Sequence, residues 1–302
     1  MPLLCIVLIA CSALMHAGWN LICKSRHPSG AFFLVSTAAS IMVMSPLTIY
    51  FAPVITKLPL AVWVLLIVTG IVQAVYYICL GNAYRVGEIS IAYPLAKAMP
   101  VMFVPAVTIA LSIGKQLNQT ALLGMVLVSL GCLILPMPSF RAIFLRRYLS
   151  KGFIFIFGAA LTTTAYTIID SEALRIFRQA DITGYLQTAL VYIALENILI
   201  ELVLILYVLL NRRERQTLRE MVHSKVLQYP AVSGVICTTS YTLVLLAMML
   251  ASNVSYIAAF RQMSIPLGAI MGIILFKESS TRPKLTGIIF IFIGLIVVGL
   301  FK

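Results

Sequence analysis

Long uninterrupted runs of apolar residues, separated by short clusters of charged and turn-forming residues, dominate this chain of 302 residues. A helix that crosses a bilayer needs roughly 20 consecutive, mainly apolar residues. The apolar positions are continuous instead of alternating, which excludes a transmembrane β-barrel. The pattern predicts ten membrane-spanning helices, at residues 3–23, 31–52, 60–82, 89–113, 119–137, 152–170, 184–210, 230–250, 254–276 and 285–301. The longest connection, near 211–229, has room for a short interfacial helix and for no extramembrane domain.

The composition agrees with a membrane protein and excludes most other classes. Apolar residues make up 62% of the chain and charged residues 10%, with a mean hydropathy of +1.06. Soluble domains are about 45–50% apolar and about 25% charged. A soluble enzyme, a disordered chain and a secreted disulfide scaffold are therefore excluded. We expect an all-α polytopic protein of the bacterial cytoplasmic membrane, with the lipid bilayer as a partner and residues 3–23 as a retained first span, because no Lys or Arg precedes Lys24.

The net charge of +13 indicates membrane orientation and does not suggest a nucleic-acid partner. The basic residues lie between apolar runs instead of on one soluble face, and cytoplasmic loops are the usual place for such charge. Connections after the odd-numbered spans carry 15 of the 22 Lys and Arg residues, the opposite face carries five, and two lie inside spans. The odd connections are accordingly expected in the cytoplasm and both termini outside.

No pattern for a metal, a nucleotide or a covalent nucleophile is visible. The six cysteines lie inside apolar runs at spacings that suit no metal site and read as small buried hydrophobes. A Walker A motif and a Gly-x-Ser-x-Gly elbow are both missing. We therefore expect no cofactor and no enzyme activity.

The sequence repeats itself weakly at a shift of 163 residues. Gly124 and Gly131 in the fifth span match Gly287 and Gly294 in the tenth. A cation precedes each glycine pair at a similar spacing, 27 residues before the first pair and 26 before the second. We expect these four glycines to allow close helix packing.

The repeat predicts two halves of five spans, residues 1–150 and 151–302. Because five is odd, the second half must face the opposite way in the membrane. Inverted repeats are typical of secondary transporters, which bind their substrate near the midplane between the halves.

Several motifs resemble the EamA-type transporters of the drug/metabolite transporter superfamily. These are His16-Ala17-Gly18-Trp19-Asn20 in the first span and the junctions at 114–116 (Gly-Lys-Gln) and 276–278 (Phe-Lys-Glu), each followed by a glycine-rich closing span. The resemblance covers the whole chain with loose motifs. It implies ten helices in two inverted repeats and transport of small metabolites or drugs. The first junction departs from the family, since Gln116 occupies the usual acidic position.

Lys97 and Arg261 are the cations inside spans four and nine. A cation at the bilayer centre costs about 2.5–3.5 kcal/mol, so two cost about 5–7 kcal/mol, which is comparable with the net stability of a protein. The functional interpretation is that both face a polar cavity and hold an anionic group, with Arg261 gripping a carboxylate or phosphonate by two hydrogen bonds. The structural alternative is that each pairs with a buried acid. A rocking transporter can use both arrangements in alternation.

Prolines stand beside both cations. Pro94, Pro100 and Pro105 fall in span four and Pro266 in span nine. Because proline kinks or breaks a helix, they predict discontinuous helices at matching depths.

Glu196, in span seven on one face with Tyr192, is the first candidate for a counter-ion or a proton carrier. Glu201 lies nearer the end of that span and is expected to reach the interface. Asp170, at the predicted end of span six, is favoured as an interface residue.

Polar and aromatic stripes on spans one, three, six and eight suit the walls of a cavity. Ser12, His16 and Asn20 recur every four residues in span one, where His16 either titrates or simply bonds a neighbouring helix. Spans two, five and ten lack such stripes and are expected at the periphery. The candidate substrate-binding residues are Lys97, Arg261, Glu196, His16, Trp19, Asn20, Tyr77, Tyr93, Tyr166 and Tyr241, with Gln73, Tyr76, Tyr84, Thr238, Thr239 and Ser240 as further polar positions.

The favoured function is a secondary transporter that moves a small polar metabolite, anionic or zwitterionic, by alternating access. An exporter of apolar or cationic drugs is the alternative within transport, and it predicts a lone acid in the cavity. An intramembrane lipid-modifying enzyme is the alternative of another class, with His16, Glu196 and Asp170 as acid and base. Substrate, direction, coupling and the choice between monomer and homodimer stay open.

The predicted orientation is tested by a tag at the C-terminus. The Lys and Arg count predicts that the tag reports the non-cytoplasmic side, measured with a reporter that is active on one side of the membrane only. A cytoplasmic signal would contradict the predicted number of spans or the charge count.

Overall fold

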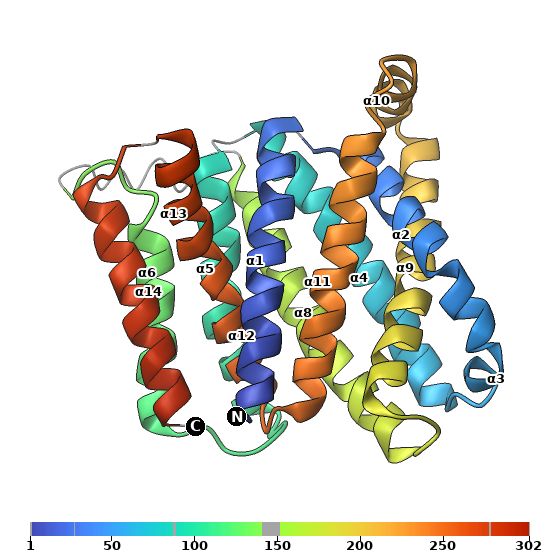
Figure 1. Cartoon of the computed structure of the whole chain (residues 1–302), viewed down its shortest axis with the longest axis horizontal. Coiled ribbons are helices and arrows are strands. Elements are labelled where there is room, and N and C mark those ends of the chain that lie inside the picture. Colours follow the sequence, from blue (N-terminus) through green and yellow to red (C-terminus); the bar gives the residue numbers. More distant parts are fainter. Residues whose placement is uncertain (1, 27, 87–88, 141–151, 278, 302) are drawn as a thin grey trace.

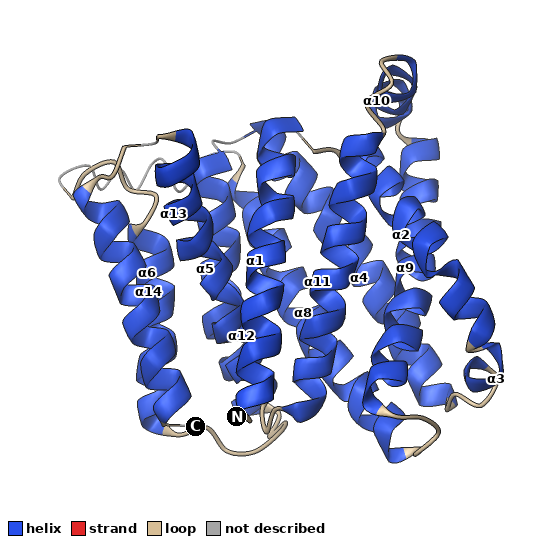
Figure 2. Ribbon diagram, viewed as in Figure 1, coloured by secondary structure: helices blue, strands red, loops and turns tan. Residues whose placement is uncertain are grey.

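The computed structural model describes all residues except 1, 27, 87–88, 141–151, 278 and 302. The described chain consists of helices joined by loops (Figure 2). The helices are α1 (Leu3–Arg26), α2 (Gly30–Tyr50), α3 (Ala52–Ile55), α4 (Leu60–Val86), α5 (Ile89–Ala110), α6 (Gln119–Ile134), α8 (Phe153–Gln179), α9 (Tyr185–Leu210), α10 (Arg212–His223), α11 (Gln228–Leu250), α12 (Val254–Phe260), the 3₁₀ turn η1 (Arg261–Met263), α13 (Ser264–Phe276) and α14 (Arg282–Leu300).

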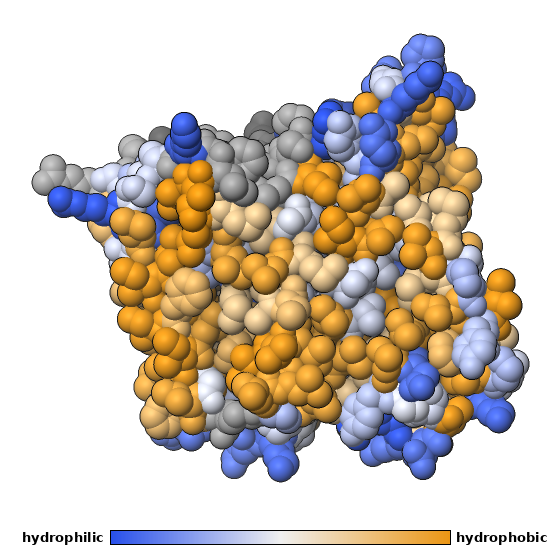
Figure 3. Space-filling model, in the orientation of Figure 1, coloured by the Kyte–Doolittle hydropathy of each residue, from blue (hydrophilic) through white to orange (hydrophobic). Residues whose placement is uncertain are grey.

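Each predicted apolar run is helical, and seven helices of the described chain are long and apolar enough to cross a membrane. They are α1, α2, α4, α8, α9, α11 and α14. These helices run roughly alongside one another (Figure 1), and on the face shown in Figure 3 apolar residues cover the middle while hydrophilic residues collect at both ends. The protein is therefore a polytopic α-helical membrane protein, as the composition predicts.

Helix α8 is longer than its apolar run, which corrects the predicted position of Asp170. The run ends at Asp170, but the helix continues to Gln179 because its last turns are stabilised by side chains. Arg175 donates to Glu172 at 2.8 Å and to Gln179 at 3.1 Å, at spacings of three and four residues. Asp170 consequently lies inside the helix and is fully buried.

The helix break predicted in span nine is present, whereas the one predicted in span four is not. Helices α12 and α13 are separated by the single 3₁₀ turn η1, which begins at Arg261. Pro266 lies one turn beyond and has no N–H to donate to the carbonyl of Gln262, so the α-helical ladder is interrupted there. Helix α5 is continuous from Ile89 to Ala110 despite three prolines.

Helix α10 confirms that the 211–229 connection holds a short helix. Asn211 caps it by accepting from the backbone N–H of Arg213 at 3.1 Å. Glu214, 1% exposed, ties it to the bundle: Oε1 lies 2.7 Å from Arg85 of α4, and Oε2 accepts from the backbone N–H of Ala31 in α2 at 2.9 Å. The helix protrudes at one end of the molecule (Figure 1).

Helices α6 and α14 form a tightly packed pair at one edge of the bundle (Figure 1). A Cβ added at Gly294 would lie 2.6 Å from the carbonyl oxygen of Gly124, and one added at Gly131 would lie 2.8 Å from that of Gly287. The prediction that these four glycines allow close packing is confirmed, as is the peripheral position of both helices.

Helix α2 is less peripheral than predicted. Its small polar residues Ser36, Thr37 and Ser40 face inward, and α2 packs against α9 and α11. Thr37 donates to Glu201, so that acid bonds a neighbouring helix and does not merely reach the interface.

The glycine seam predicts a sharp difference between two single substitutions. Gly294→Ala forces the α6 backbone away and should lower stability by about 1–3 kcal/mol, as overpacking does. Gly268→Ala is the matched control, because nothing lies within 4 Å of its added Cβ. Thermal unfolding in detergent compares the two, and equal melting temperatures would contradict the close approach.

Candidate functional site

A cavity lies among α1, α4, α8, α9, α11 and η1, where polar side chains from both halves of the sequence meet. The empty space inside it, including the part that opens outward, is about 450 Å³. Its lining consists of His16, Trp19, Gln73, Tyr76, Tyr77, Tyr166, Ile193, Asn197, Cys237, Thr238, Tyr241 and Arg261. A second space of about 250 Å³ adjoins it toward α2 and shares Trp19, Tyr77, Cys237 and Thr238.

The α1 wall is formed by His16 and Trp19. The indole Nε1–H of Trp19 donates to Nδ1 of His16 at 2.9 Å, and the two rings meet edge to face. Nε2 of His16 lies 3.2 Å from Nζ of Lys97 on α5, so Lys97 is buried behind His16. Asn20 donates to the carbonyl oxygen of His16 at 2.6 Å, which anchors the same turn.

Arg261 reaches the cavity from the first residue of η1. Its guanidinium donates to the Tyr166 hydroxyl at 3.3 Å and to the Thr167 hydroxyl at 3.5 Å, both on α8. Its Cζ also lies 5.8 Å from the ring centre of Tyr166 and 5.2 Å from that of Tyr241. Cation–π contacts of this kind are worth about 0.5–2 kcal/mol each. Lys97 is within electrostatic range of Arg261, so the two cations belong to one site.

Asp170 is the most heavily bonded side chain near the cavity. Its Oδ1 accepts from Thr69 at 2.6 Å and from Tyr192 at 2.8 Å. Its Oδ2 accepts from Tyr241 and, at 3.5 Å, from Gln73. Helices α4, α8, α9 and α11 are thereby joined at one buried carboxylate, which is how such a group is tolerated inside a membrane protein.

Glu196 lies on α9, one turn after Tyr192, and is fully buried. Gln73 donates to its Oε1 as well as to Asp170. Oε2 of Glu196 is buried and has no hydrogen-bond partner among the described residues. The closest group to Glu196 is thus the Gln73 amide, while Asp170 and Thr69 also interact with it and Arg261 acts on it through space.

Six of the ten candidate residues from the sequence line the cavity: His16, Trp19, Tyr77, Tyr166, Tyr241 and Arg261. Lys97, Asn20 and Glu196 form contacts one layer behind the lining. Tyr93 lies on α5, and its side chain is outside the described part of the chain.

The sequence did not single out Thr69, Asn197 or Cys237. Thr69, Gln73 and Tyr77 recur every four residues along α4, a periodicity that marks the face toward the cavity. Cys237 reads as a small buried hydrophobe in the sequence, but it lies in the lining. Asn197 follows Glu196 directly and donates to Thr238 at 3.4 Å.

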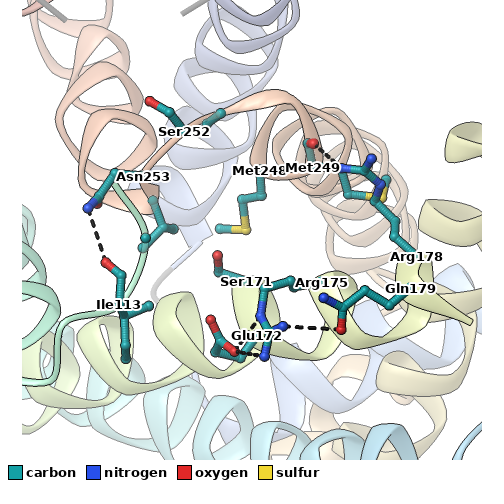
Figure 4. A pocket seen from close by; sticks show the side chains of 13 residues that line it. Ile113, Ser171, Glu172, Arg175, Arg178, Gln179, Met248, Met249, Ser252 and Asn253 are labelled. Carbon is teal, nitrogen blue, oxygen red and sulfur yellow. Dashed lines mark hydrogen bonds and ion pairs between the residues drawn. The ribbon is translucent and has the colours of Figure 1, made fainter. Parts of the chain in front are cut away.

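A separate pocket opens beyond Asp170 on the same helix, where α8 faces the loop between α11 and α12 (Figure 4). It spans about 850 Å³, including open solvent, and Ser171, Glu172 and Arg175 form one wall. Arg178 reaches across to the carbonyl oxygen of Met249 at 2.7 Å, at the end of α11. Asn253 closes the other side by donating to the carbonyl oxygen of Ile113 at 3.2 Å.

The described residues contain no group of three His, Cys, Asp or Glu side chains that could hold a metal ion. The cavity offers one guanidinium, four tyrosines, an indole and amide groups. Chemically, this set is able to bind a small polar molecule by charge and hydrogen bonds.

No protein-family model matches the chain, and no curated protein matches it. Among solved structures, one described only as "Crystal structure of protein" is similar with a TM-score of 0.67 and 14% sequence identity. The match covers 98% of this chain and 96% of that chain. At this identity the similarity shows the shared fold alone.

Tyr241 connects the cavity to Asp170 and is open to a stability test. Tyr241→Phe keeps the ring under Arg261 and removes the O–H donor from a buried carboxylate. Hydrogen bonds to charged groups contribute about 1.5–3 kcal/mol, so the free energy of unfolding should fall by that amount. Tyr50→Phe is the control, because Tyr50 is 76% exposed. Denaturant unfolding in mixed micelles measures both variants, and equal losses would count against the Asp170 network.

Proposed function

We propose that the protein is a secondary transporter that moves a small polar metabolite, anionic or zwitterionic, across the bacterial cytoplasmic membrane. In this proposal ten crossings form two inverted repeats, residues 1–150 and 151–302. The binding site is the cavity between them, and the repeats rock to expose it to each side in turn.

The packing of the helices supports the inverted repeats. Under the proposed correspondence α1 matches α8, α2 matches α9, α4 matches α11, α5 matches the α12–α13 run and α6 matches α14. The pair α1 with α11 then corresponds to α8 with α4, and α2 with α11 corresponds to α9 with α4; all four pairs are in contact. Helices α6 with α14, and α2 with α9, pair with their own counterparts. A two-fold pseudosymmetry in the membrane plane requires this pattern.

The two intramembrane cations follow the same symmetry. Lys97 in the fourth crossing contacts His16 of the first. Arg261 in the ninth crossing contacts Tyr166 and Thr167 of the sixth. Each half thus directs its cation to its own first helix, at the boundary between the halves.

The charge of the cavity lining is the basis for the proposed substrate class. Its described residues include one permanently charged side chain, Arg261, and no carboxylate. Asp170 and Glu196 are held behind Gln73 and Tyr241 by hydrogen bonds. An exporter of cationic drugs needs an acid facing the cavity, so the lining favours a substrate with a carboxylate, phosphate or phosphonate. The guanidinium can grip such a group with two parallel hydrogen bonds.

The helix break at Arg261 supports a moving site. A residue at a 3₁₀ turn between two helices can change its backbone angles without disrupting a continuous ladder, as hinges do. The break therefore lets the guanidinium follow its ligand while α12 and α13 tilt independently.

Transport by reconstituted protein tests the proposal. Proteoliposomes are offered radiolabelled glutamate, succinate, phosphonoacetate and inorganic phosphate, and the wild type should move at least one of them. Arg261→Gln should weaken uptake by at least about 30-fold, because losing one partner of a desolvated charge contact costs about 2–5 kcal/mol. Arg261→Lys keeps the positive charge but cannot form two parallel hydrogen bonds, and it should retain part of the activity.

Arg219→Gln on the exposed face of α10 is the matched control and should transport like the wild type. Membrane insertion and monodispersity should be the same for all variants. Unchanged uptake by Arg261→Gln would remove Arg261 from the binding site.

A further inference from the structure

Two fully buried carboxyl groups meet at one amide, between α8 and α9. Asp170 and Glu196 are both 0% exposed. The NH₂ group of Gln73 donates to Oε1 of Glu196 and, at 3.5 Å, to Oδ2 of Asp170. Two negative charges this close in a region of low dielectric repel each other strongly, so one carboxyl group of such a pair holds a proton.

The hydrogen bonds decide which carboxyl group holds it. Asp170 accepts from four donors, Thr69, Tyr192, Tyr241 and Gln73, and hydrogen bonds of this kind stabilise the charged form. Glu196 accepts from Gln73, and its Oε2 is buried without a partner among the described residues. A buried oxygen with no donor is poorly placed for a negative charge but can carry a hydrogen.

We propose that Glu196 is a proton-binding site that is loaded together with the anionic substrate, so that the carrier moves a proton and an anion in the same direction. This inference rests on the proposed transport function and assigns its coupling ion. The bond that forms is O–H on Glu196, and it breaks when the proton is released with the substrate on the other side.

Tyr241 and Arg261 connect the two ligands. The Tyr241 hydroxyl donates to Asp170, and the Tyr241 ring lies 5.2 Å from the guanidinium carbon of Arg261. Arg261 is within electrostatic range of both Asp170 and Glu196. While the cavity is empty, its positive charge favours negative charge on the acids.

An anion bound to Arg261 cancels that positive charge, and Glu196 then holds its proton more firmly. By linkage, the proton must strengthen the anion's binding by the same factor. The coupling between the two binding events is therefore positive, so proton and anion bind together and do not compete.

The other groups around the two carboxyl groups do not reverse this positive coupling. Helix α4 presents the uncharged Thr69 and Gln73, and α2 presents Thr37 to Glu201 further along α9. The titratable or charged groups that face the two carboxyl groups are Tyr192 on α9, Tyr241 on α11 and Arg261 at η1. A second set surrounds Arg261 on the other side of the cavity: Tyr166 on α8, Tyr76 and Tyr77 on α4, Cys237 on α11, His16 on α1 and Lys97 on α5. Each cation among them, like Arg261, favours negative charge on the carboxyl pair, and a bound anion weakens that effect.

Infrared spectroscopy of the reconstituted full-length protein tests the proton site without any substrate. The wild type at neutral pH should show the carbonyl band of a protonated carboxylic acid, shifted by H/D exchange. Glu196→Gln should lose that band, whereas Glu220→Gln, an exposed control on α10, should keep it. Glu196→Asp, which retains a carboxyl group, should show the band at a shifted frequency. A wild type without the band, or a Glu196→Gln variant that keeps it, overturns the proposal.

Proton flux then tests coupling, with the four anions of the transport panel as probes and a pH dye inside the liposomes. Uptake by the wild type should acidify the lumen, and uptake should increase as the external pH falls. Glu196→Gln should still exchange labelled for unlabelled anion but should move no protons. Equal proton flux in both proteins, or competition between protons and anion, overturns the inference while transport stands. If the wild type moves none of the anions but shows the Glu196 band, the proposed substrate class fails and the proton site stands.

Discussion

A guanidinium held inside a bundle of apolar helices is the constraint around which this structure is organised. Such a charge costs about 2.5–3.5 kcal/mol at the centre of a membrane, so it persists only where neighbouring groups compensate. Arg261 obtains two hydroxyl acceptors on α8 and two tyrosine rings. It also acts through space on Asp170, which lies behind Tyr241. The compensation is polar and incomplete, because no carboxylate of the described residues pairs directly with the guanidinium. In the proposed transporter, the ligand supplies that carboxylate.

The two halves of the chain use their cations differently. Lys97 is buried behind His16, whose other ring nitrogen is fixed by Trp19. Arg261 lines the cavity itself. His16 is thus the partner of the cation in the first half, whereas Tyr166 and Thr167 are its partners in the second half. In the proposed transporter this asymmetry divides the roles, with Arg261 contacting the ligand and Lys97 setting the charge of the cavity wall around it.

The sequence predicts the helices well because the length of an apolar run is set by the bilayer. Every predicted span is helical, and the seven long apolar helices confirm a polytopic membrane protein. The end of α8 is predicted nine residues early, since hydropathy stops at Asp170 whereas the hydrogen-bond ladder continues to Gln179. Pro266 predicts a real break, but the three prolines of α5 do not break that helix. The ten crossings, the inverted repeats and the EamA resemblance stay predictions.

The site is predicted in part, because side chains on one helix face can be found from periodicity but their partners cannot. His16, Trp19 and Arg261 stand out as polar or charged residues in apolar spans, and all three line the cavity. The bridge from Gln73 to Asp170 and Glu196 joins residues about a hundred positions apart. That contact depends on which helices pack together, and no local pattern encodes it. The bonds of Asp170 to Thr69, Tyr192 and Tyr241 are likewise encoded by no local pattern.

The position of a bound anion tests the central claim most directly. A crystal or cryo-electron microscopy structure with a bromine- or iodine-labelled carboxylate would locate the anion by its heavy atom. The account predicts density in the cavity beside the Arg261 guanidinium, between α1, α8 and α11. Density confined to the outer pocket at Arg175, with the cavity unchanged, would contradict it.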